Sequence, residues 1–322
     1  MSKLLEVRSA SVVFDTGGGS SKRALDDISL EIGGPTPSIT AVVGESGSGK
    51  STLIRLLLGF QHPTDGEVSY NGQNVATLSS SAARTFRREV QAIFQDPFDA
   101  FNPFYKIDHP LVTPLKAFGL VASRDEAYER IERTLRSVGL DPANTLGKYP
   151  HQLSGGQRQR VMIARSLLLD PQIVLADEPV SMVDASLRAT ILDILYGLKQ
   201  ELGISLVYVT HDLTTAYQVA DTIVVLHGGH IMEVGPSEKV IHDPRHAYTR
   251  ALIEAVPSPD PDKPWNLEEE PPSPDAFLSA GADLALYATE PDRAIAAPRR
   301  SSEPAVTAAS IQRAVMAQKA QQ

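Results

Sequence analysis

The stretch VVGESGSGKSTLIRLLLG, residues 42–59, sets glycines and small hydroxyl side chains around a single lysine. The spacing Gly44-x-x-x-x-Gly49-Lys50-Ser51 matches a phosphate-binding P-loop. Backbone N–H groups point inward in such a loop, and side chains in place of the glycines would keep a polyphosphate from reaching them. We therefore expect Lys50 to reach the β- and γ-phosphates of a nucleoside triphosphate and the Ser51 hydroxyl to bind Mg²⁺.

The segments on both sides of the loop predict the elements that would position it. Residues 38–43, SITAVV, have the composition of a short buried strand, and residues 51–59 have the leucine spacing of a helix that ends at Gly59. The N-terminus of that helix adds partial positive charge next to the loop. A Gly/Ser turn without a function would not require the lysine, the hydroxyl and both flanks together. The chain is therefore predicted to bind a nucleoside triphosphate.

Polar residues at the ends of other apolar strands predict the second half of this site. QIVLADEP, residues 172–179, ends in two acids, which places Asp177 at the carboxyl edge of a parallel sheet beside the P-loop. We expect Asp177 to hold the hydration shell of Mg²⁺ and Glu178 to polarise an attacking water. His211 ends the next apolar strand and is expected to face the same γ-phosphate. The amide of Gln95, after AIF, could contact Mg²⁺ or water, and spacing alone leaves its role open.

The segment LSGGQRQRVMIARSLLLDP, residues 153–171, predicts a second anion site. Ser154, Gly155 and Gly156 lead directly into a helix, whose N-terminal N–H groups can bind a phosphate. A simple P-loop kinase needs only one such cradle. One solution is that the second cradle serves the nucleotide of another copy of the protein.

Composition limits the classes of protein to consider. The 322 residues carry a formal net charge of −9 and have a pI near 5.4, which argues weakly against a nucleic-acid-binding protein. The chain has no cysteine, so disulfides, thiolate metal sites and Cys-ligated clusters are excluded. No apolar run is long enough to span a membrane. These properties favour a soluble cytoplasmic protein.

Alternation of apolar strands and amphipathic helices after residue 172 predicts a parallel sheet with crossover helices. Residues 4–32 alternate as strands do, on either side of a Gly/Ser turn. The pattern changes over about residues 98–165, where DEAYERIERTLRSVGL predicts an amphipathic helix. From residue 257 the chain becomes rich in proline and acid. We expect residues 257–322 to be a linker and a largely disordered tail, with at most a marginal helix at its end.

With LSGGQ included, residues 4 to about 256 resemble the nucleotide-binding subunit of an ABC transporter. The D-loop departs from the commoner SALD at Met182 and Val183 but keeps its serine and aspartate. The motifs of that family are matched by the Walker A residues Gly44, Glu45, Ser46, Gly47, Ser48, Gly49, Lys50, Ser51 and Thr52, the Q-loop Gln95, the signature Ser154, Gly155, Gly156 and Gln157, the Walker B Asp177 and Glu178, the D-loop Asp184, the switch His211, and Phe14, an aromatic that would stack on adenine.

The resemblance implies an α/β P-loop NTPase fold of ABC type, with a RecA-like core and mixed sheet, an N-terminal antiparallel β subdomain and an inserted helical subdomain. It places the nucleotide-binding domain at residues 1–256, with the helical subdomain at about 98–165. It implies an active ATPase that uses ATP and Mg²⁺, with Ser51, Gln95 and Asp177 at the metal and Glu178 as the catalytic base. Two subunits would close head to tail on two ATP molecules.

The segments QDPFDAFNPF and HDPRHAYTRAL resemble the oligopeptide and dipeptide importers of this family. Some members import cello-oligosaccharides instead, which is the alternative. A soluble ABC ATPase acting on nucleic acid or ribosomes is a remote alternative, because such proteins usually carry two nucleotide-binding domains or long insertions.

The importer interpretation implies a second ATPase subunit, as a homo- or heterodimer, two permease subunits and an extracytoplasmic solute-binding protein, with no nucleic acid. It places the chain at the cytoplasmic face of the membrane, peripheral through the permease. Many relatives carry an iron–sulfur cluster near the C-terminus, and without cysteine this chain cannot form one.

Overall fold

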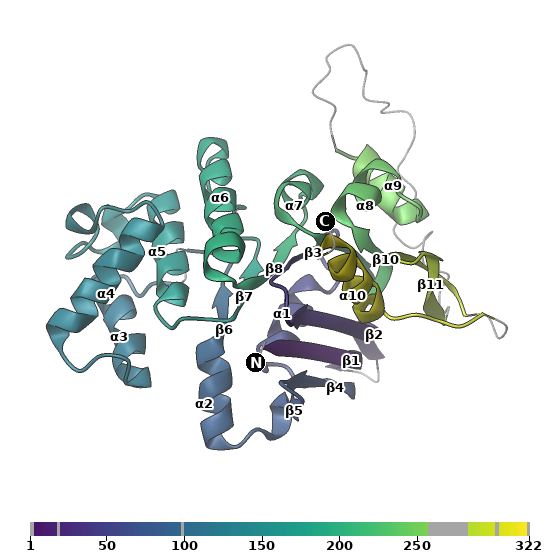
Figure 1. Ribbon diagram of the computed structural model, residues 1–322, viewed down its shortest axis with the longest axis horizontal. Coiled ribbons are helices and arrows are strands. Elements are labelled where there is room, and N and C mark those ends of the chain that lie inside the picture. Colours follow the sequence, from purple (N-terminus) through teal and green to yellow (C-terminus); the bar gives the residue numbers. More distant parts are fainter. Residues whose placement is uncertain (1–2, 18–19, 98–99, 257–282, 300–302, 321–322) are drawn as a thin grey trace, which may run out of the picture. The chain divides into compact units, whose positions relative to one another are not determined.

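The computed structural model describes residues 3–17, 20–97, 100–256, 283–299 and 303–320 (Figure 1). Within them the chain forms two compact α/β units. Of the described residues, the first unit contains those within 1–5, 32–39 and 70–209, and the second contains those within 6–31, 40–69 and 210–322. No helix among these described residues is both long and apolar enough to cross a membrane.

Three parallel strands form the sheet of the first unit. They are β6 (Val90–Ile93), β7 (Ile173–Asp177) and β8 (Ser205–Thr210), in that spatial order. The register pairs Ile93 with Ala176 and Asp177 with Val209, so the carboxyl ends of the strands lie at one edge. The nearly continuous apolar runs of β7 and β8 are buried, as expected of strands covered on both faces.

The first unit also contains five α-helices among the described residues. They are α2 (Ser80–Glu89), α3 (Asp108–Phe118), α4 (Arg124–Ser137), α5 (Gly155–Leu167) and α6 (Ala185–Leu202), with short 3-10 turns at Val75–Thr77, Pro142–Asn144 and Pro150–Gln152. Helix α4 packs against α3 and α5 (Figure 1). Its buried residues Ala127, Ile131 and Leu135 recur every four positions, so they form one apolar stripe. This stripe attaches α4 to its neighbours.

The second unit has a mixed sheet. Strand β3 (Ile39–Val43) runs parallel to β9 (Thr222–His227), and β10 (His230–Pro236) returns antiparallel to β9. Its helices are α1 (Lys50–Leu57), α7 (Leu213–Val219), α8 (Ser237–His242) and α9 (Ala247–Glu254). A separate antiparallel sheet contains β2 (Ser20–Gly33), β1 (Leu4–Gly17) and β4 (Asp65–Tyr70). The two-residue strand β5 (Gln73–Asn74) consists of residues of the first unit.

The C-terminal segment is ordered where a largely disordered tail was predicted, so that prediction was wrong for residues 283–299 and 303–320. Strands β11 (Leu284–Glu290) and β12 (Arg293–Pro298) form a hairpin, and β12 pairs with β10. Helix α10 (Ala308–Lys319) packs on β9, β10 and β12. An isolated hairpin is marginal in water, but a hairpin added to an existing sheet shares that sheet's buried surface. The linker at residues 257–282 lies outside the described residues.

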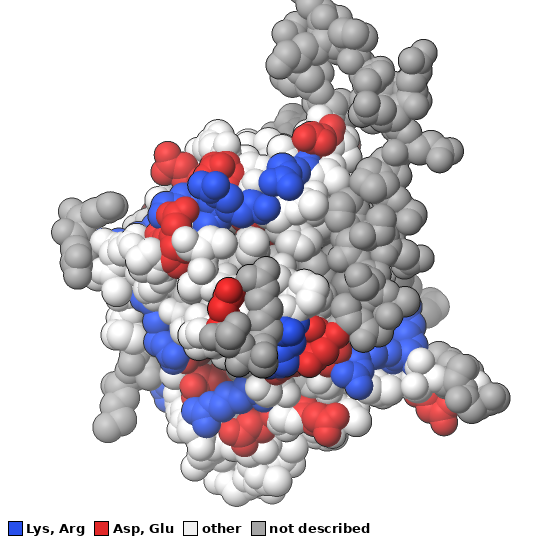
Figure 2. All heavy atoms as spheres, turned by 90° about the vertical axis from the view of Figure 1, so that its right-hand side faces the viewer, with Lys and Arg blue, Asp and Glu red and all other residues white. Residues whose placement is uncertain are grey.

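Polar contacts also attach α10 to the unit. Gln312 is buried; its Oε1 accepts from the Glu31 N–H at 2.9 Å, and its Nε2 donates to Thr40 Oγ1 at 3.1 Å. Lys319 Nζ lies 2.6 Å from Asp221 Oδ1. On the face shown in Figure 2, basic and acidic side chains of described residues lie next to one another. The segment is therefore tied to the unit by paired charges as well as by apolar burial.

Candidate functional site

The P-loop of the second unit joins β3 to α1, as the sequence predicted. Gly49 is the N-cap of α1, with φ 111°, and Gly47 has φ 83°. A Cβ on Gly49 would lie 2.5 Å from the carbonyl oxygen of Ala24, and a Cβ on Gly44 would collide with the carbonyl oxygen of Leu226. Glycine is therefore required at these positions, because the backbone is left-handed at Gly47 and Gly49 and because other backbone segments of the protein approach Gly44 and Gly49 closely.

Lys50 turns back under the loop. Its side chain is buried, and Nζ donates to the carbonyl oxygens of Gly44 at 2.7 Å and Glu45 at 2.8 Å. The loop is closed further by the Ser48 N–H, which donates to the Glu45 carbonyl at 3.3 Å. Helix α1 begins without a side-chain cap. An ammonium group and the N–H groups of a helix start thus meet at one place, which suits a phosphate.

The remaining Walker A residues follow this arrangement. Ser46, Gly47 and Ser51 are exposed, Glu45 and Thr52 are half-buried, and Ser48 is buried. The Ser51 hydroxyl at the start of α1 is therefore open to a ligand on the loop.

In the first unit, the structure brings Gln95 and Glu178 together. They follow β6 and β7, which are adjacent parallel strands, and Gln95 Nε2 donates to Glu178 Oε2 at 3.3 Å. Glu178 has φ 45°, an unfavourable conformation for a residue other than glycine. Its N–H donates to the Val209 carbonyl at 2.9 Å, and its carbonyl accepts from the Ser181 N–H at 3.1 Å and hydroxyl at 2.9 Å. These bonds hold the strained backbone and so orient the carboxylate.

The signature residues form the start of α5. Ser154 Oγ accepts from the Gln157 N–H at 3.2 Å, and Gln157 Oε1 accepts from the Ser154 N–H at 2.9 Å, a complete capping box. A Cβ on Gly156 would collide with the Leu187 side chain of α6, whereas one on Gly155 would meet only the Met182 carbonyl at 3.6 Å. Gly156 therefore allows α5 and α6 to approach closely.

The other predicted site residues lie at element ends or on a strand. Asp177 is half-buried at the end of β7, and Asp184 is the exposed N-cap of α6 in the first unit. In the second unit His211 is exposed directly after β8, and Phe14 of β1 has 38% of its surface exposed. Their roles at a nucleotide stay predictions.

Two residues near the P-loop were missing from the predicted site. His227 Nδ1 lies 2.7 Å from Glu45 Oε1, and the Tyr248 hydroxyl accepts from the Glu45 N–H at 3.3 Å. The rings of His227 and Tyr248 pack with centroids 4.2 Å apart. His227 ends a buried apolar strand, TIVVLH, as His211 does, and that pattern could have identified it. Tyr248 has no such local signal.

Comparison with known proteins agrees with these motifs. Residues 25–181 match the family described as ABC transporter, and residues 232–281 match the C-terminal region of oligopeptide/dipeptide transporters. The oligopeptide transport ATP-binding protein OppF of Escherichia coli K12 is 39% identical over 285 residues, which cover 84% of each chain. This chain belongs to the ABC transporter family. The di/tripeptide transport ATP-binding protein DppF of Pseudomonas aeruginosa is 41% identical over 260 residues, covering 80% of this chain and 79% of that protein.

Solved structures of ABC cassettes share the fold. The ATP-binding cassette MJ0796, as a post-hydrolysis dimer bound to ADP and Pi, gives a TM-score of 0.65 at 28% identity, covering 72% of this chain and 98% of that chain. CbiO1 of Clostridium perfringens gives a TM-score of 0.64 at 26% identity, covering 74% and 90%. The predicted family and ABC-type fold are confirmed, and the chain is an ATPase of the ABC family.

Proposed function

We propose that this ABC ATPase hydrolyses ATP to drive the import of oligopeptides or dipeptides. The observation that carries the hydrolytic part is the pairing of Gln95 and Glu178 at the ends of adjacent parallel strands, on the same chain as a P-loop with a buried lysine. The solute class is supported by the match of residues 232–281 to oligopeptide/dipeptide transporters and by the two relatives named for peptide transport. These relatives do not favour the oligosaccharide alternative.

Catalysis would consist mainly of positioning and charge neutralisation, as in phosphoryl transfer generally. Lys50 and the N–H groups at the start of α1 would bind the γ-phosphate, and the Glu178 carboxylate would accept a proton from the attacking water. His211 would contact the same phosphate. Release of ADP and phosphate completes the cycle.

The donors predicted for Mg²⁺ suit that ion chemically. Ser51 offers an exposed hydroxyl, Gln95 an exposed amide oxygen and Asp177 a half-buried carboxylate, all hard oxygen ligands. We propose that they hold Mg²⁺, which neutralises phosphate charge when bound.

A second ATPase subunit would complete each nucleotide site. The exposed Ser154 and the helix start behind it would meet ATP bound by the partner, and the exposed Asp184 would lie at the same contact. We propose that two such subunits, identical or different, act with two permease subunits and an extracytoplasmic solute-binding protein. The chain would then lie at the cytoplasmic face of the membrane.

The surface of the first unit offers a place for the permease. A hollow of about 400 Å³ is lined by Phe101, Tyr105, His109 and Pro114 among others. Phe104 beside it has 85% of its surface exposed. An apolar hollow with an exposed aromatic residue suits a helix of another protein. We propose that a cytoplasmic helix of a permease subunit docks here.

The Glu178→Gln variant tests the hydrolytic assignment. Removing the carboxylate removes the proton acceptor but leaves the P-loop intact, so we expect hydrolysis to fall at least about 100-fold while labelled ATP still binds. Phosphate release and ATP titration measure the two effects. Glu129→Gln, on α4, is the matched control and should keep full turnover. Near-normal hydrolysis by Glu178→Gln would remove this residue from the catalytic role.

Co-purification from native membranes tests the transport assignment. Recovery of permease subunits with the tagged full-length chain, followed by peptide binding to the associated solute-binding protein, would support the proposal. Recovery of ribosomes or nucleic acid without any membrane protein would contradict it, and sugar binding would restore the oligosaccharide alternative.

A further inference from the structure

Glu45 of the P-loop is held on both sides of its peptide backbone. Its carbonyl accepts from Lys50 Nζ at 2.8 Å, whereas its N–H donates to the Tyr248 hydroxyl at 3.3 Å. The same hydroxyl lies 3.4 Å from Glu45 Oε1, to which it donates. Burial raises the pKa of Tyr248 to about 12, so the hydroxyl stays protonated at neutral pH. Tyr248 therefore helps to set the position of the peptide that also holds the P-loop lysine.

Tyr248 is placed by the start of helix α9. The His246 side chain caps this helix, and its Nδ1 accepts from the Tyr248 N–H at 3.1 Å. Burial lowers the pKa of His246, which favours the neutral ring that can accept this bond. The backbone before the helix is fixed by Glu233 of β10, whose carboxylate accepts from the N–H groups of Arg245 at 3.1 Å and His246 at 3.0 Å. A buried carboxylate thus determines where α9 begins.

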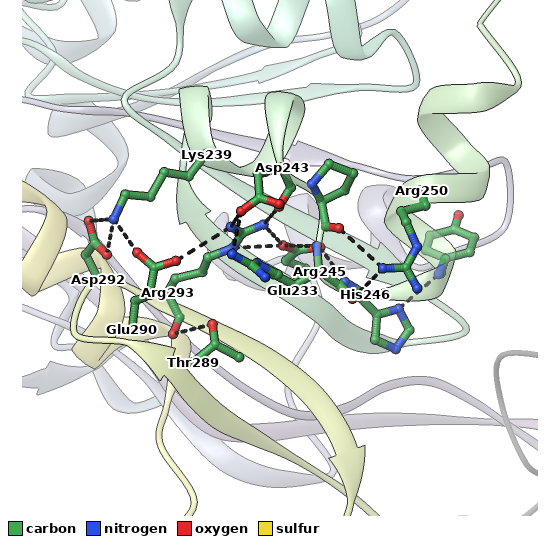
Figure 3. Close-up of polar contacts among 12 residues, drawn as sticks. Glu233, Lys239, Asp243, Arg245, His246, Arg250, Thr289, Glu290, Asp292 and Arg293 are labelled. Carbon is green, nitrogen blue, oxygen red and sulfur yellow. Dashed lines mark hydrogen bonds and ion pairs between the residues drawn. The ribbon is translucent and has the colours of Figure 1, made fainter.

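The C-terminal hairpin supplies the positive charge that pairs with Glu233. Arg293 of β12 and Glu233 are both fully buried, and Arg293 Nε donates to Glu233 Oε1 at 3.0 Å. Arg293 Nη2 also donates to the Asp243 carbonyl in the loop before α9. Figure 3 shows Arg293 reaching from the hairpin toward Glu233 and this loop. A buried carboxylate without such a partner would be strongly destabilised.

We propose that Arg293 and Tyr248 are positioning residues for the ATP site. Tyr248 acts directly on Glu45 of the P-loop, and Arg293 acts through Glu233, which fixes the start of α9 and so places Tyr248. The C-terminal hairpin then contributes to nucleotide affinity, although the family match to the C-terminal region ends at residue 281. This inference rests on the proposed binding of ATP at the P-loop. It assigns a function to a segment whose sequence predicted none.

The Tyr248→Phe variant is the sharpest test because it removes one hydroxyl and keeps the ring packed against His227. Loss of one or two hydrogen bonds should weaken labelled-ATP binding and raise the KM for ATP about threefold to tenfold, with kcat within about twofold. Arg293→Met should act in the same direction, and Arg293→Lys should restore part of the affinity because it keeps the charge. If Arg293→Met does not fold, Tyr248→Phe and Arg293→Lys decide the question.

A double-mutant cycle separates positioning from general destabilisation. If Arg293 acts on the P-loop through Tyr248, then Tyr248→Phe should change the affinity for ATP less than about twofold in the Arg293→Met background. Lys239→Ala is the matched control: Lys239 Nζ holds the same hairpin through Asp292 at 2.9 Å and Glu290 at 2.6 Å, and in Figure 3 its dashed lines lead to these two residues and not to α9. It should lower the Tm and leave the KM for ATP unchanged.

The outcomes are distinguishable from failure of the functional proposal. Fully additive losses, or an unchanged KM in Tyr248→Phe, would overturn the positioning role. If Lys50→Ala still bound ATP normally, the nucleotide site itself would be wrong. Loss of binding in Lys50→Ala together with normal binding in Tyr248→Phe would reject only the present inference.

Discussion

Two loops of similar composition, the P-loop before α1 and the signature before α5, start their helices in different ways. The P-loop has Gly49 at the N-cap in left-handed conformation and no side-chain cap. The signature has Ser154 at the N-cap, and its hydroxyl already accepts from the Gln157 N–H. Both helix starts could bind an anion, but only the P-loop adds a buried lysine.

The difference bears on the phosphate binding that we propose for the two loops. In the P-loop, glycine at the N-cap places no side chain over the helix start, and Lys50 adds a full positive charge. In the signature, the capping box uses the Ser154 hydroxyl and satisfies the N–H groups of Ser154 and Gln157 within the chain, so a phosphate there would meet fewer available donors than at the P-loop. This fits a signature that meets a nucleotide already bound by a partner subunit.

The largest expected effect comes from Lys50→Ala, which removes the charge that distinguishes the P-loop. Loss of a buried charged donor should weaken ATP binding about 100-fold or more. Titration with labelled ATP measures the loss. Arg55→Ala changes an exposed basic residue in the last turn of the same helix and should bind ATP normally. Equal affinities in the two variants would show that Lys50 does not bind the nucleotide.

A smaller but still large effect is expected from Gly49→Ala. The new Cβ would lie 2.5 Å from a backbone carbonyl oxygen, at φ 111°. Strain and overlap together should lower the free energy of unfolding by about 3 kcal/mol, which urea denaturation can measure. Gly155→Ala at the signature meets only one atom at 3.6 Å and should shift stability by less than about 0.5 kcal/mol. Similar losses in both variants would contradict the contrast between the loops.

The smallest effect is expected from Ser154→Ala, which removes the cap of α5. Loss of this bond to the Gln157 N–H should cost about 1 kcal/mol of unfolding free energy, and Ser154→Asp should recover most of it. Urea denaturation of the three proteins provides the comparison. An unchanged stability in Ser154→Ala would mean that the capping box does not support α5.

Local patterns predicted most elements around the candidate site. The strand before the P-loop, the helix after it, and β7 with its terminal acids were expected from runs of apolar residues and from motif spacing, and the structure contains them. These features depend on residues that are neighbours in the chain, so periodicity and spacing reveal them. The position of Glu178 at the end of β7 is one of the features that short-range patterns predict.

The C-terminal hairpin could not be recognised in the same way. Its strands LALYATE and RAIAAP are short and rich in alanine, and they follow a segment typical of a linker. These strands fold because β12 pairs with β10 and because Arg293 is buried against Glu233, 60 positions earlier in the chain. Because the partner that buries this segment lies so far away in the chain, the segment itself shows no periodic pattern of apolar residues.

The sequence by itself determined the family, the P-loop and the strand-end acids, because their chemistry requires particular residue types at short, fixed spacings. Only the tertiary structure decided that Gln95 meets Glu178, that Tyr248 holds Glu45 from 203 positions away, and that the C-terminal segment is folded. These contacts join residues whose separation along the chain is arbitrary. The packing of the strands and helices, and not their spacing, brings them together.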